Sequence, residues 1–280
     1  MRHQVLAALL AGIALLPALA QAMDCKKATS NIEQLICADP RLVTADAAMG
    51  KAYTTLLKAT NDTEIRAMLV ASQRRWVAAR DSSFGDLDNS TDGQTGEGFS
   101  KEDQRNIVLK AMQGRTRQLG ELAKSGQPRL IETALQQRAF AGRFSGGPFA
   151  GFSASCDFLP HSGEYDYACF GTHFYQHHNR VCSVTQDWAS GSVYETRAVA
   201  DVVGGKMKPV ATCKPGETEC APQDWSVEPG SLDADTQRTY AQQGAMTLSK
   251  LDAEVVEDDD TQWLQSCLTE PNYPARATAK

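Results

Sequence analysis

Eight cysteines constrain the fold of this chain more than any other feature. An even number of cysteines in an exported chain is typical of a disulfide framework, which stabilises a domain by restricting its unfolded state. A zinc site is the competing interpretation, and it is disfavoured because no two cysteines have the C-x-x-C spacing. All eight follow the apolar N-terminal stretch: Cys25, Cys37, Cys156, Cys169, Cys182, Cys213, Cys220 and Cys267.

The N-terminus has the pattern of an export signal. Arg2 and His3 form a basic start, residues 5–19 are largely apolar, and the chain then reads Ala-Gln-Ala up to Ala22. Small residues at these spacings are typical of a signal-peptide cleavage site. The apolar run is shorter than the roughly 20 residues that a membrane-spanning helix needs. We therefore predict a signal peptide over residues 1–22, cleavage near Ala22, and a periplasmic or extracellular protein with no integral membrane association.

Residues 23–127 are predicted to form a helical domain. Ser30 and Glu33 have the spacing of a capping box at the start of a short helix, which Pro40 ends. Three longer segments follow, and in each the apolar residues recur at i, i+3 and i+4. Short polar breaks separate them, which favours a bundle of antiparallel hairpins. We expect these helices at residues 43–59, at 64–81 and from 101 onward.

Residues 128–280 are predicted to form a mainly β domain. One more helix, at residues 130–139, links it to the bundle. From Phe140 onward, alternation of apolar and polar residues replaces helical spacing, and Gly204-Gly205 has the composition of a hairpin turn. The fold class is therefore α+β: a disulfide-tied helical bundle followed by a disulfide-rich antiparallel β domain. We expect strands at residues 165–174, 180–188 and 193–203.

Disulfide pairing in the second domain is only partly indicated. Cys213 and Cys220 flank a loop with proline and glycine, and they could close locally. For the other four cysteines three pairings are possible, and the sequence does not choose among them. These four are Cys156, Cys169, Cys182 and Cys267.

Gln73, Trp76 and Arg80 share one face of the helix expected at residues 64–81. One interpretation is a ligand groove along that face. The other is a buried tryptophan whose polar neighbours bond carboxylates such as Glu33 or Asp46. Bulky aromatic residues at helical spacing usually lie in a core, which favours the structural interpretation.

The same residues belong to a longer pattern over residues 24–125. It combines a cysteine, an A-x-x-x-x-E-x-x-I-C helix, an aspartate, a tyrosine and Q-x-x-W-x-x-x-R-D. This pattern resembles the N-terminal domain of the LprI-type lysozyme inhibitors. The resemblance implies a Cys25–Cys37 disulfide and an exported protein that inhibits lysozyme. Many members carry a cysteine after the Arg-Asp pair, where this chain has Ser82, Ser83 and Phe84. The matching residues are Cys25, Ala28, Glu33, Ile36, Cys37, Asp46, Tyr53, Gln73, Trp76, Arg80 and Asp81.

Two Ser/Tyr motifs in the second half are candidate partner contacts. The first holds Ser162 and Tyr165, and the second holds Ser190 and Tyr194. Unrelated β-barrel lysozyme inhibitors insert similar loops into the enzyme cleft. A lysozyme site is a pair of carboxylates, to which hydroxyl groups can donate hydrogen bonds without adding charge. The alternative is a Ser-Gly turn with an ordinary strand tyrosine.

No catalytic, metal or cofactor site is predicted. His173, His177 and His178 are interpreted as exposed strand histidines because a third ligand with its supporting shell is missing. Asp258 to Asp260 are interpreted as a solvated acidic loop without calcium-site spacing. No nucleophile motif or phosphate-binding glycine loop occurs.

Charge is unevenly divided between the two halves. Residues 23–127 carry 15 basic and 14 acidic side chains, and residues 128–280 carry 12 and 20. This distribution disfavours a nucleic-acid partner and suits a basic one, although solubility alone would also explain it. Together these observations predict a non-enzymatic protein that occludes the cleft of lysozyme or a related peptidoglycan-cleaving enzyme. The alternatives are an immunity protein against a cell-wall-degrading toxin and an envelope structural or stress-related protein without an enzyme target.

Overall fold

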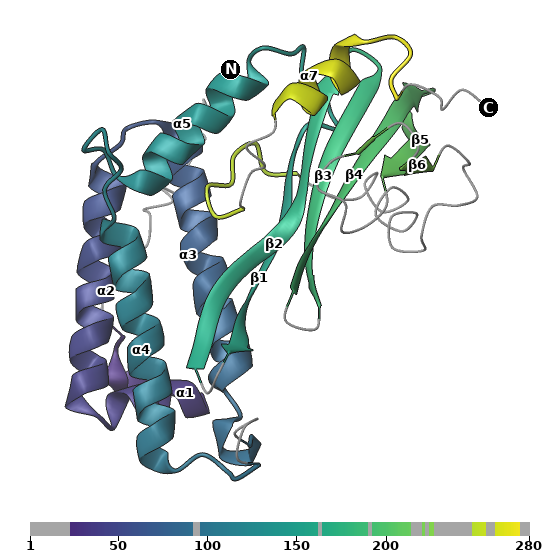
Figure 1. Ribbon diagram of the computed structural model, residues 1–280. Helices are drawn as coiled ribbons and strands as arrows, with labels where there is room; N and C mark the ends of the chain where they lie inside the picture. Colours follow the sequence, from purple (N-terminus) through teal and green to yellow (C-terminus); the bar gives the residue numbers. More distant parts are fainter. Residues whose placement is uncertain are drawn as a thin grey trace, which may run out of the picture.

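The computed structural model has helices in its N-terminal part and an antiparallel sheet in its C-terminal part (Figure 1). This arrangement confirms the predicted α+β class. In the part of the chain that the structure describes, no helix is both long enough and apolar enough to cross a membrane. The described residues are 23–91, 96–161, 164–189, 192–213, 220–221, 224–226, 248–255 and 261–274.

Local sequence explains where the helices begin. The predicted capping box forms at Ser30, and a second one forms between Ser100 and Asp103. The first of the three long helices begins at Pro40, three residues before the expected start, because the Asp39 side chain caps it and proline is favoured at the first helical position. The elements are η1 (Cys25–Lys27), α1 (Asn31–Cys37), α2 (Pro40–Lys58), α3 (Thr63–Phe84), η2 (Leu87–Asn89), α4 (Lys101–Gly120), α5 (Arg129–Ala141) and α7 (Thr261–Thr269).

The sheet is a six-stranded meander in which each strand pairs with its neighbours in sequence. Gly204 and Gly205 both have positive φ angles, 60° and 73°, so they form the predicted turn between two strands. The strands are β1 (Gly151–His161), β2 (Glu164–His177), β3 (Arg180–Ala189), β4 (Ser192–Val203), β5 (Lys206–Cys213) and β6 (Trp225–Ser226).

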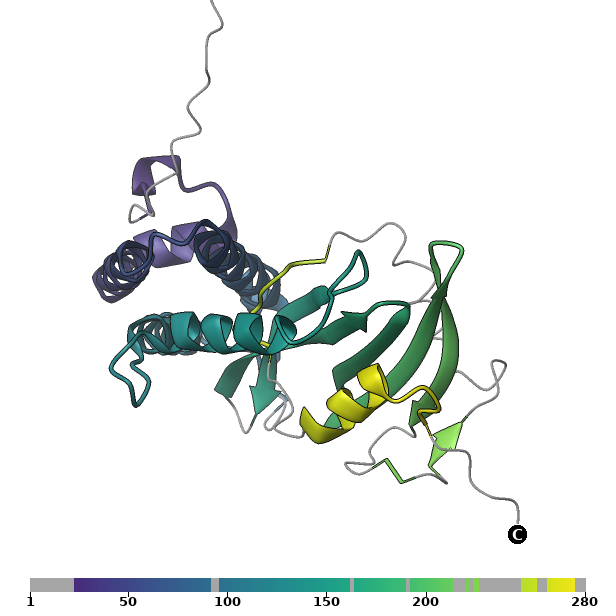
Figure 2. The same cartoon turned by 90° about the horizontal axis from the view of Figure 1, so that it is seen from above.

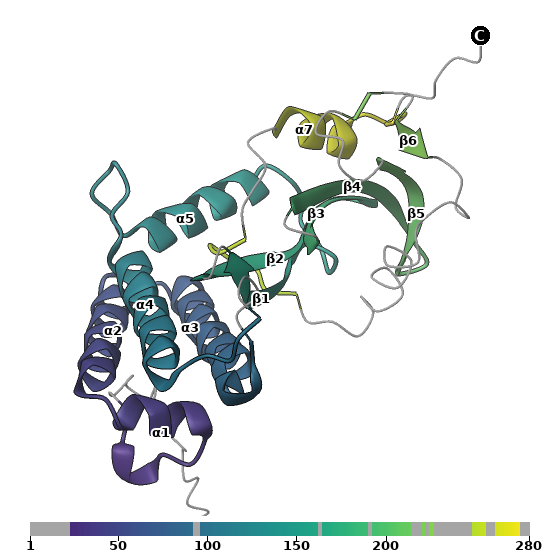
Figure 3. The same ribbon diagram turned by 60° about the horizontal axis from the view of Figure 1, so that its bottom comes forward.

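The β1–β2 and β3–β4 hairpins of the sheet diverge from each other toward their turns. Strand β2 pairs with β3 only from Gly171 to His177, whereas it pairs with β1 along almost its whole length. The end of the β1–β2 hairpin is therefore free of β3, and it packs on α3 and α4 instead. The β3–β4 hairpin lies apart from helices α2 to α4, as Figures 1 and 3 show. Helix α7 lies across one face of the sheet (Figure 2).

Helices and sheet share one hydrophobic core. Phe158 of β1 is buried in the same cluster as Trp76 of α3 and Leu251, a residue from near the C-terminal end. A second cluster, around Val184 and Val199, lies under α7. The first core joins elements far apart in sequence, so the end of the β1–β2 hairpin is packed as an integral part of the bundle.

Four disulfides join all eight cysteines. Cys25 pairs with Cys37, as the resemblance implied, and this bond closes the two ends of the η1–α1 segment. Cys213 pairs with Cys220 across the short loop. Of the three pairings left open, the structure has Cys156–Cys169, between directly opposed residues of β1 and β2, and Cys182–Cys267, which fastens α7 to β3.

Candidate functional site

The α3 row, which comprises Gln73, Trp76 and Arg80, faces the protein interior. Trp76 is fully buried, and its ring meets that of Phe158 edge to face with 5.9 Å between centroids. The Arg80 guanidinium lies 5.7 Å from the centroid of the Trp76 ring. Aromatic pairs in this geometry contribute about 0.5–1.5 kcal/mol beyond the area they bury. Trp76 thus anchors β1 to the helices.

The two polar members of the α3 row have partners other than those expected. Gln73 Oε1 accepts a hydrogen bond from Arg115 Nε at 3.0 Å. Arg80 donates through Nε and Nη2 to Asp81 Oδ1, at 2.8 and 2.6 Å. Neither bonds Glu33 or Asp46. Both side chains are used within the protein, which accords with the structural interpretation of this row.

Glu33, Asp46 and Tyr53 also have structural surroundings. Glu33 Oε2 accepts hydrogen bonds from the backbone nitrogens of Thr29 and Ser30, and these bonds lower the pKa of its carboxyl group. Asp46 Oδ2 accepts one from the backbone nitrogen of Met23 at 2.6 Å. Tyr53 lies in the helical core, where burial raises the pKa of its phenol.

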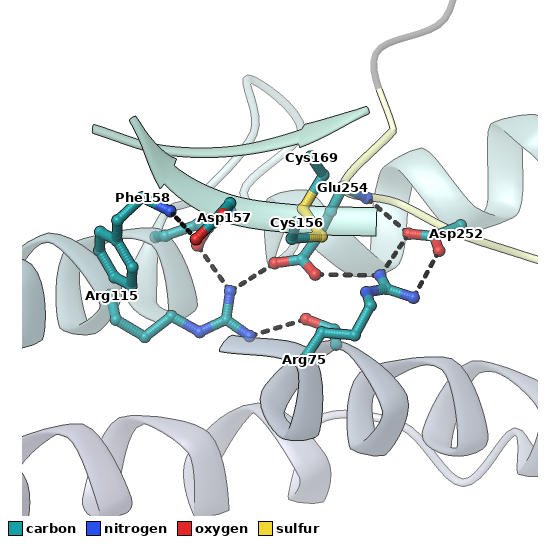
Figure 4. Close-up of a disulfide and its surroundings, with 10 residues drawn as sticks. Arg75, Arg115, Cys156, Asp157, Phe158, Cys169, Asp252 and Glu254 are labelled. Atoms are coloured by element: carbon teal, nitrogen blue, oxygen red, sulfur yellow. Dashed lines mark hydrogen bonds and ion pairs between the residues drawn. A yellow bond between two sulfur atoms is a disulfide. The ribbon is translucent and has the colours of Figure 1, made fainter. Parts of the chain in front are cut away.

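A buried ionic network fastens the C-terminal segment to the bundle. Glu254 forms ion pairs with both Arg115 and Arg75, and Arg75 also pairs with Asp252 at 2.7 Å (Figure 4). Arg115 donates a further hydrogen bond to Ser72 Oγ at 2.7 Å. Removing one partner from such a buried pair leaves an uncompensated charge and costs about 3–5 kcal/mol. These residues therefore fix residues 251–255 firmly against α3 and α4.

No motif in the sequence predicted this network. Gln137 of α5 and the backbone of Asp252 exchange two hydrogen bonds, of 2.9 and 3.1 Å, which place the aspartate in the core. Burial raises the pKa of Asp252, and the Arg75 guanidinium opposes that shift. The available signal was the alternation of apolar and acidic residues in Leu-Asp-Ala-Glu-Val at residues 251–255.

A groove of about 1070 Å³ remains between α4 and the end of the β1–β2 hairpin. Small residues of α4, Ala111 and Gly114, line one side, and Tyr167 lines the other. An ion pair between Lys110 and Glu164, both exposed, joins the two sides. Exposed ion pairs contribute only about 0–1 kcal/mol. The pair therefore adds little to the packing of α4 against the hairpin.

Comparison with known proteins assigns the helical part of the chain to a family. Residues 25–119 match the family described as Lysozyme inhibitor LprI. These residues form an LprI domain. The match ends near the end of α4, so α5 and the sheet lie outside it. No curated protein and no solved structure matches this chain.

Tyr165, from the first Ser/Tyr motif, packs against the LprI domain. Its ring lies edge to face with Phe84 at 5.4 Å, and the ring of Phe99 is 6.5 Å away. Its partner in the motif, Ser162, lies outside the described residues. Tyr165 therefore takes part in the contact between the β1–β2 hairpin and the LprI domain.

Tyr194, from the second motif, lies in a different environment at the end of the β3–β4 hairpin. It is 39% exposed, and Trp188 and Val193 beside it are 37% and 60% exposed. Trp188 lies directly opposite Val193, whereas Tyr194 lies opposite Asp187, so apolar side chains occupy both faces of the hairpin. Ser190 lies outside the described residues. We call Trp188, Val193 and Tyr194 the hairpin-end patch.

The predicted exposure of the three histidines is wrong for His173. Its ring is buried between those of Phe152 and Tyr175, with centroids 3.6 and 3.7 Å away. His177 Nδ1 accepts a hydrogen bond from the backbone nitrogen of Ser145. The interpretation failed because β2 is covered on both faces near its C-terminal end. Asp258 to Asp260 lie outside the described residues.

A single group of potential metal ligands occurs within the described ranges, and it consists of Cys156, Cys169 and Glu254. The two cysteines are joined in a disulfide, and Glu254 pairs with two arginines (Figure 4). Thiolates bind metals, whereas disulfide sulfurs are poor ligands. This donor set is better explained as part of the buried network.

Proposed function

We propose that this protein inhibits lysozyme or a related peptidoglycan-cleaving enzyme outside the cytoplasm. The LprI domain at residues 25–119 is the observation that carries the proposal. The eight cysteines, all in disulfides, support an oxidising compartment, where such an enzyme would be met. The protein acts by binding, and it occludes the catalytic cleft of its target.

The hairpin-end patch is the proposed contact surface. Three of the seven large hydrophobic side chains that are exposed among the described residues lie in this patch. They lie at the end of one hairpin, Trp188 and Val193 on one face and Tyr194 on the other, and aromatic anchors dominate the binding energy at protein interfaces. The strand ladder continues to Ala189 opposite Ser192, so the patch is presented on paired backbone rather than on a loose loop. Little ordering is then required on binding.

Chemistry in the enzyme cleft suits this patch. Glycoside hydrolases use a pair of carboxylates, and the Tyr194 phenol can donate a hydrogen bond to one of them while its ring fills apolar space. The excess of acidic side chains in residues 128–280 attracts a basic enzyme and accelerates encounter. Tyr165 and the α3 row are used for internal packing, which supports a contact in the β3–β4 hairpin.

The test is a titration of the purified protein against c-, g- and i-type lysozymes, with activity and direct binding measured at low and high salt. We expect inhibition of at least one type, weaker at high salt because charge screening slows association. The absence of both inhibition and binding at low salt would contradict the proposal and favour an envelope protein without an enzyme target.

The contact surface is tested by Trp188→Ser with Tyr194→Ser. We expect the inhibition constant to rise by roughly thirtyfold or more, as for truncated interface anchors. Val203→Ser is a matched control, because Val203 is 48% exposed at the other end of β4. Equal inhibition by the double variant and the control would place the contact elsewhere.

A further inference from the structure

Asp46 carries a buried carboxylate that no positively charged side chain of the described residues compensates. It lies on α2, and 7% of its surface is exposed. Its Oδ2 atom accepts a hydrogen bond from the backbone nitrogen of Met23 at 2.6 Å. In the part of the chain that is described, no lysine, arginine or histidine side chain forms an ion pair with it. Burying an ionised carboxylate costs several kcal/mol unless a positive charge compensates it.

Met23 is held firmly at this position. Its side chain packs on the core of the LprI domain, and its Sδ atom lies 3.8 Å from Cys37 Sγ. Two residues later the chain is fixed again by the Cys25–Cys37 disulfide. The backbone nitrogen of Met23 is therefore placed on Asp46 by contacts that do not depend on what precedes it.

Met23 is also the first residue after the Ala-Gln-Ala sequence that ends at Ala22. We propose that the Ala22–Met23 bond is the export cleavage site and that Asp46 is the binding site for the α-ammonium group created there. Hydrolysis by a signal peptidase consumes one water molecule. The bond between the Ala22 carbonyl carbon and the Met23 nitrogen breaks, the water oxygen joins that carbon to give a carboxylate, and both water protons go to the Met23 nitrogen, which becomes an ammonium group. A hydrogen bond in which only the carboxylate is charged thereby becomes an ion pair in which both groups are charged.

Cleavage thus supplies the positive charge that compensates the Asp46 carboxylate in the LprI domain. In the precursor, Asp46 faces an amide that carries no charge. In the mature protein the same two atoms are an ammonium nitrogen and a carboxylate oxygen, with no rearrangement of the chain. This inference does not depend on the proposed function, because it concerns the stability of the domain and not its partner.

The cleavage site is tested on the full-length protein exported from a bacterial host. N-terminal sequencing and the intact mass of the purified protein should show Met23 as the first residue. Any other first residue would overturn the proposal, because the ammonium group would then lie away from Asp46.

The ion pair is tested with a form that retains Ala22, made by protease cleavage of a fusion, so that the Met23 nitrogen stays an amide. We expect this extension to raise the equilibrium constant of unfolding in urea by tenfold or more. In the Asp46→Asn background the extension should change it by less than about twofold. Equal effects in both backgrounds would overturn the proposal.

Asp24→Asn is the matched control for this cycle. Asp24 is the next acidic residue to Met23, but its side chain is half exposed and caps η1. The extension should remain as destabilising in Asp24→Asn as in the unchanged protein. A loss of the effect in Asp24→Asn would mean that the ammonium group pairs with the exposed carboxylate, which also overturns the assignment to Asp46.

Discussion

The face of the LprI domain that carries Trp76 and the end of the β3–β4 hairpin are both rich in aromatic residues, but they differ in what covers them. Phe158 and residues 251–255 pack on the first. At the second, Trp188, Val193 and Tyr194 are exposed. The motif residues Gln73, Trp76 and Arg80 therefore pack inside the protein, whereas the exposed apolar side chains of the hairpin-end patch lie outside the residues that match the LprI family.

The two regions also differ in how charge is used. At the α3 face, Arg75 and Arg115 meet Asp252 and Glu254 in a buried network. Such a network specifies one docking geometry for the segment that carries the acids, whereas exposed charges near a hairpin end mainly affect association rates. The comparison predicts that mutations at the first region unfold the protein and mutations at the second affect binding.

Trp76→Ala should have the largest effect on stability, a loss of about 3–5 kcal/mol in the free energy of unfolding, because it leaves a cavity at the contact between α3 and β1. Urea denaturation followed by circular dichroism measures it. Trp188→Ala is the matched comparison and should change stability by no more than about 0.5 kcal/mol. Similar losses for both tryptophans would remove the distinction between the two regions.

Glu254→Gln should cost about 3–5 kcal/mol, since it leaves the buried Arg115 without its carboxylate partner. The same denaturation experiment applies. Glu270→Gln, at an exposed position after α7, serves as the control and should be nearly neutral. A neutral Glu254→Gln would show that residues 251–255 are held by apolar contacts alone.

Replacing both Cys182 and Cys267 by serine should cost about 4 kcal/mol, because that disulfide closes a separation of 85 residues. The same change at Cys213 and Cys220, which are seven residues apart, should cost about 2 kcal/mol. Thermal unfolding of the two double variants measures the difference. The opposite order would mean that α7 contributes little to the stability of the sheet that presents the hairpin-end patch.

Arg138→Gln should have the smallest effect and should change the pH dependence of stability. The Arg138 guanidinium of α5 holds the pKa of the Asp62 carboxyl well below its usual value. A lowered folded-state pKa stabilises the protein above the unfolded value of about 3.9, and this contribution is lost as pH falls through the folded pKa. Thermal midpoints below pH 4 should therefore fall less steeply in the variant. If the thermal midpoint falls equally steeply below pH 4 in the variant and in the unchanged protein, this pair does not link α5 to the LprI domain.

Much of the fold could be predicted because its signals are local. The Ser30 capping box and the Gly204-Gly205 turn each depend on residues within a few positions of one another, and both form as predicted. The early start of α2 at Pro40 shows the limit of such signals. Pro40 was expected to end the first helix, but that helix ends at Cys37, and Pro40 instead begins the next helix, which the Asp39 side chain caps.

The candidate site was harder to predict because exposure depends on distant contacts. Tyr165 and Tyr194 occur in similar motifs, yet one packs on Phe84 and the other is exposed. His173 was expected on the surface and is buried between two rings. In each case a strand alternates as predicted, but the element that covers its face comes from another part of the chain.

By itself, the sequence determined the α+β class, the positions of most helices and strands, and the likeness of residues 25–119 to the LprI family. Capping, periodicity and turn composition are properties of neighbouring residues, so they can be recognised without coordinates. Only the tertiary structure decided that Arg115 meets Glu254 across 139 positions and that the β1–β2 hairpin covers Trp76. Those contacts arise from the packing of separate segments into one core, which no local pattern encodes.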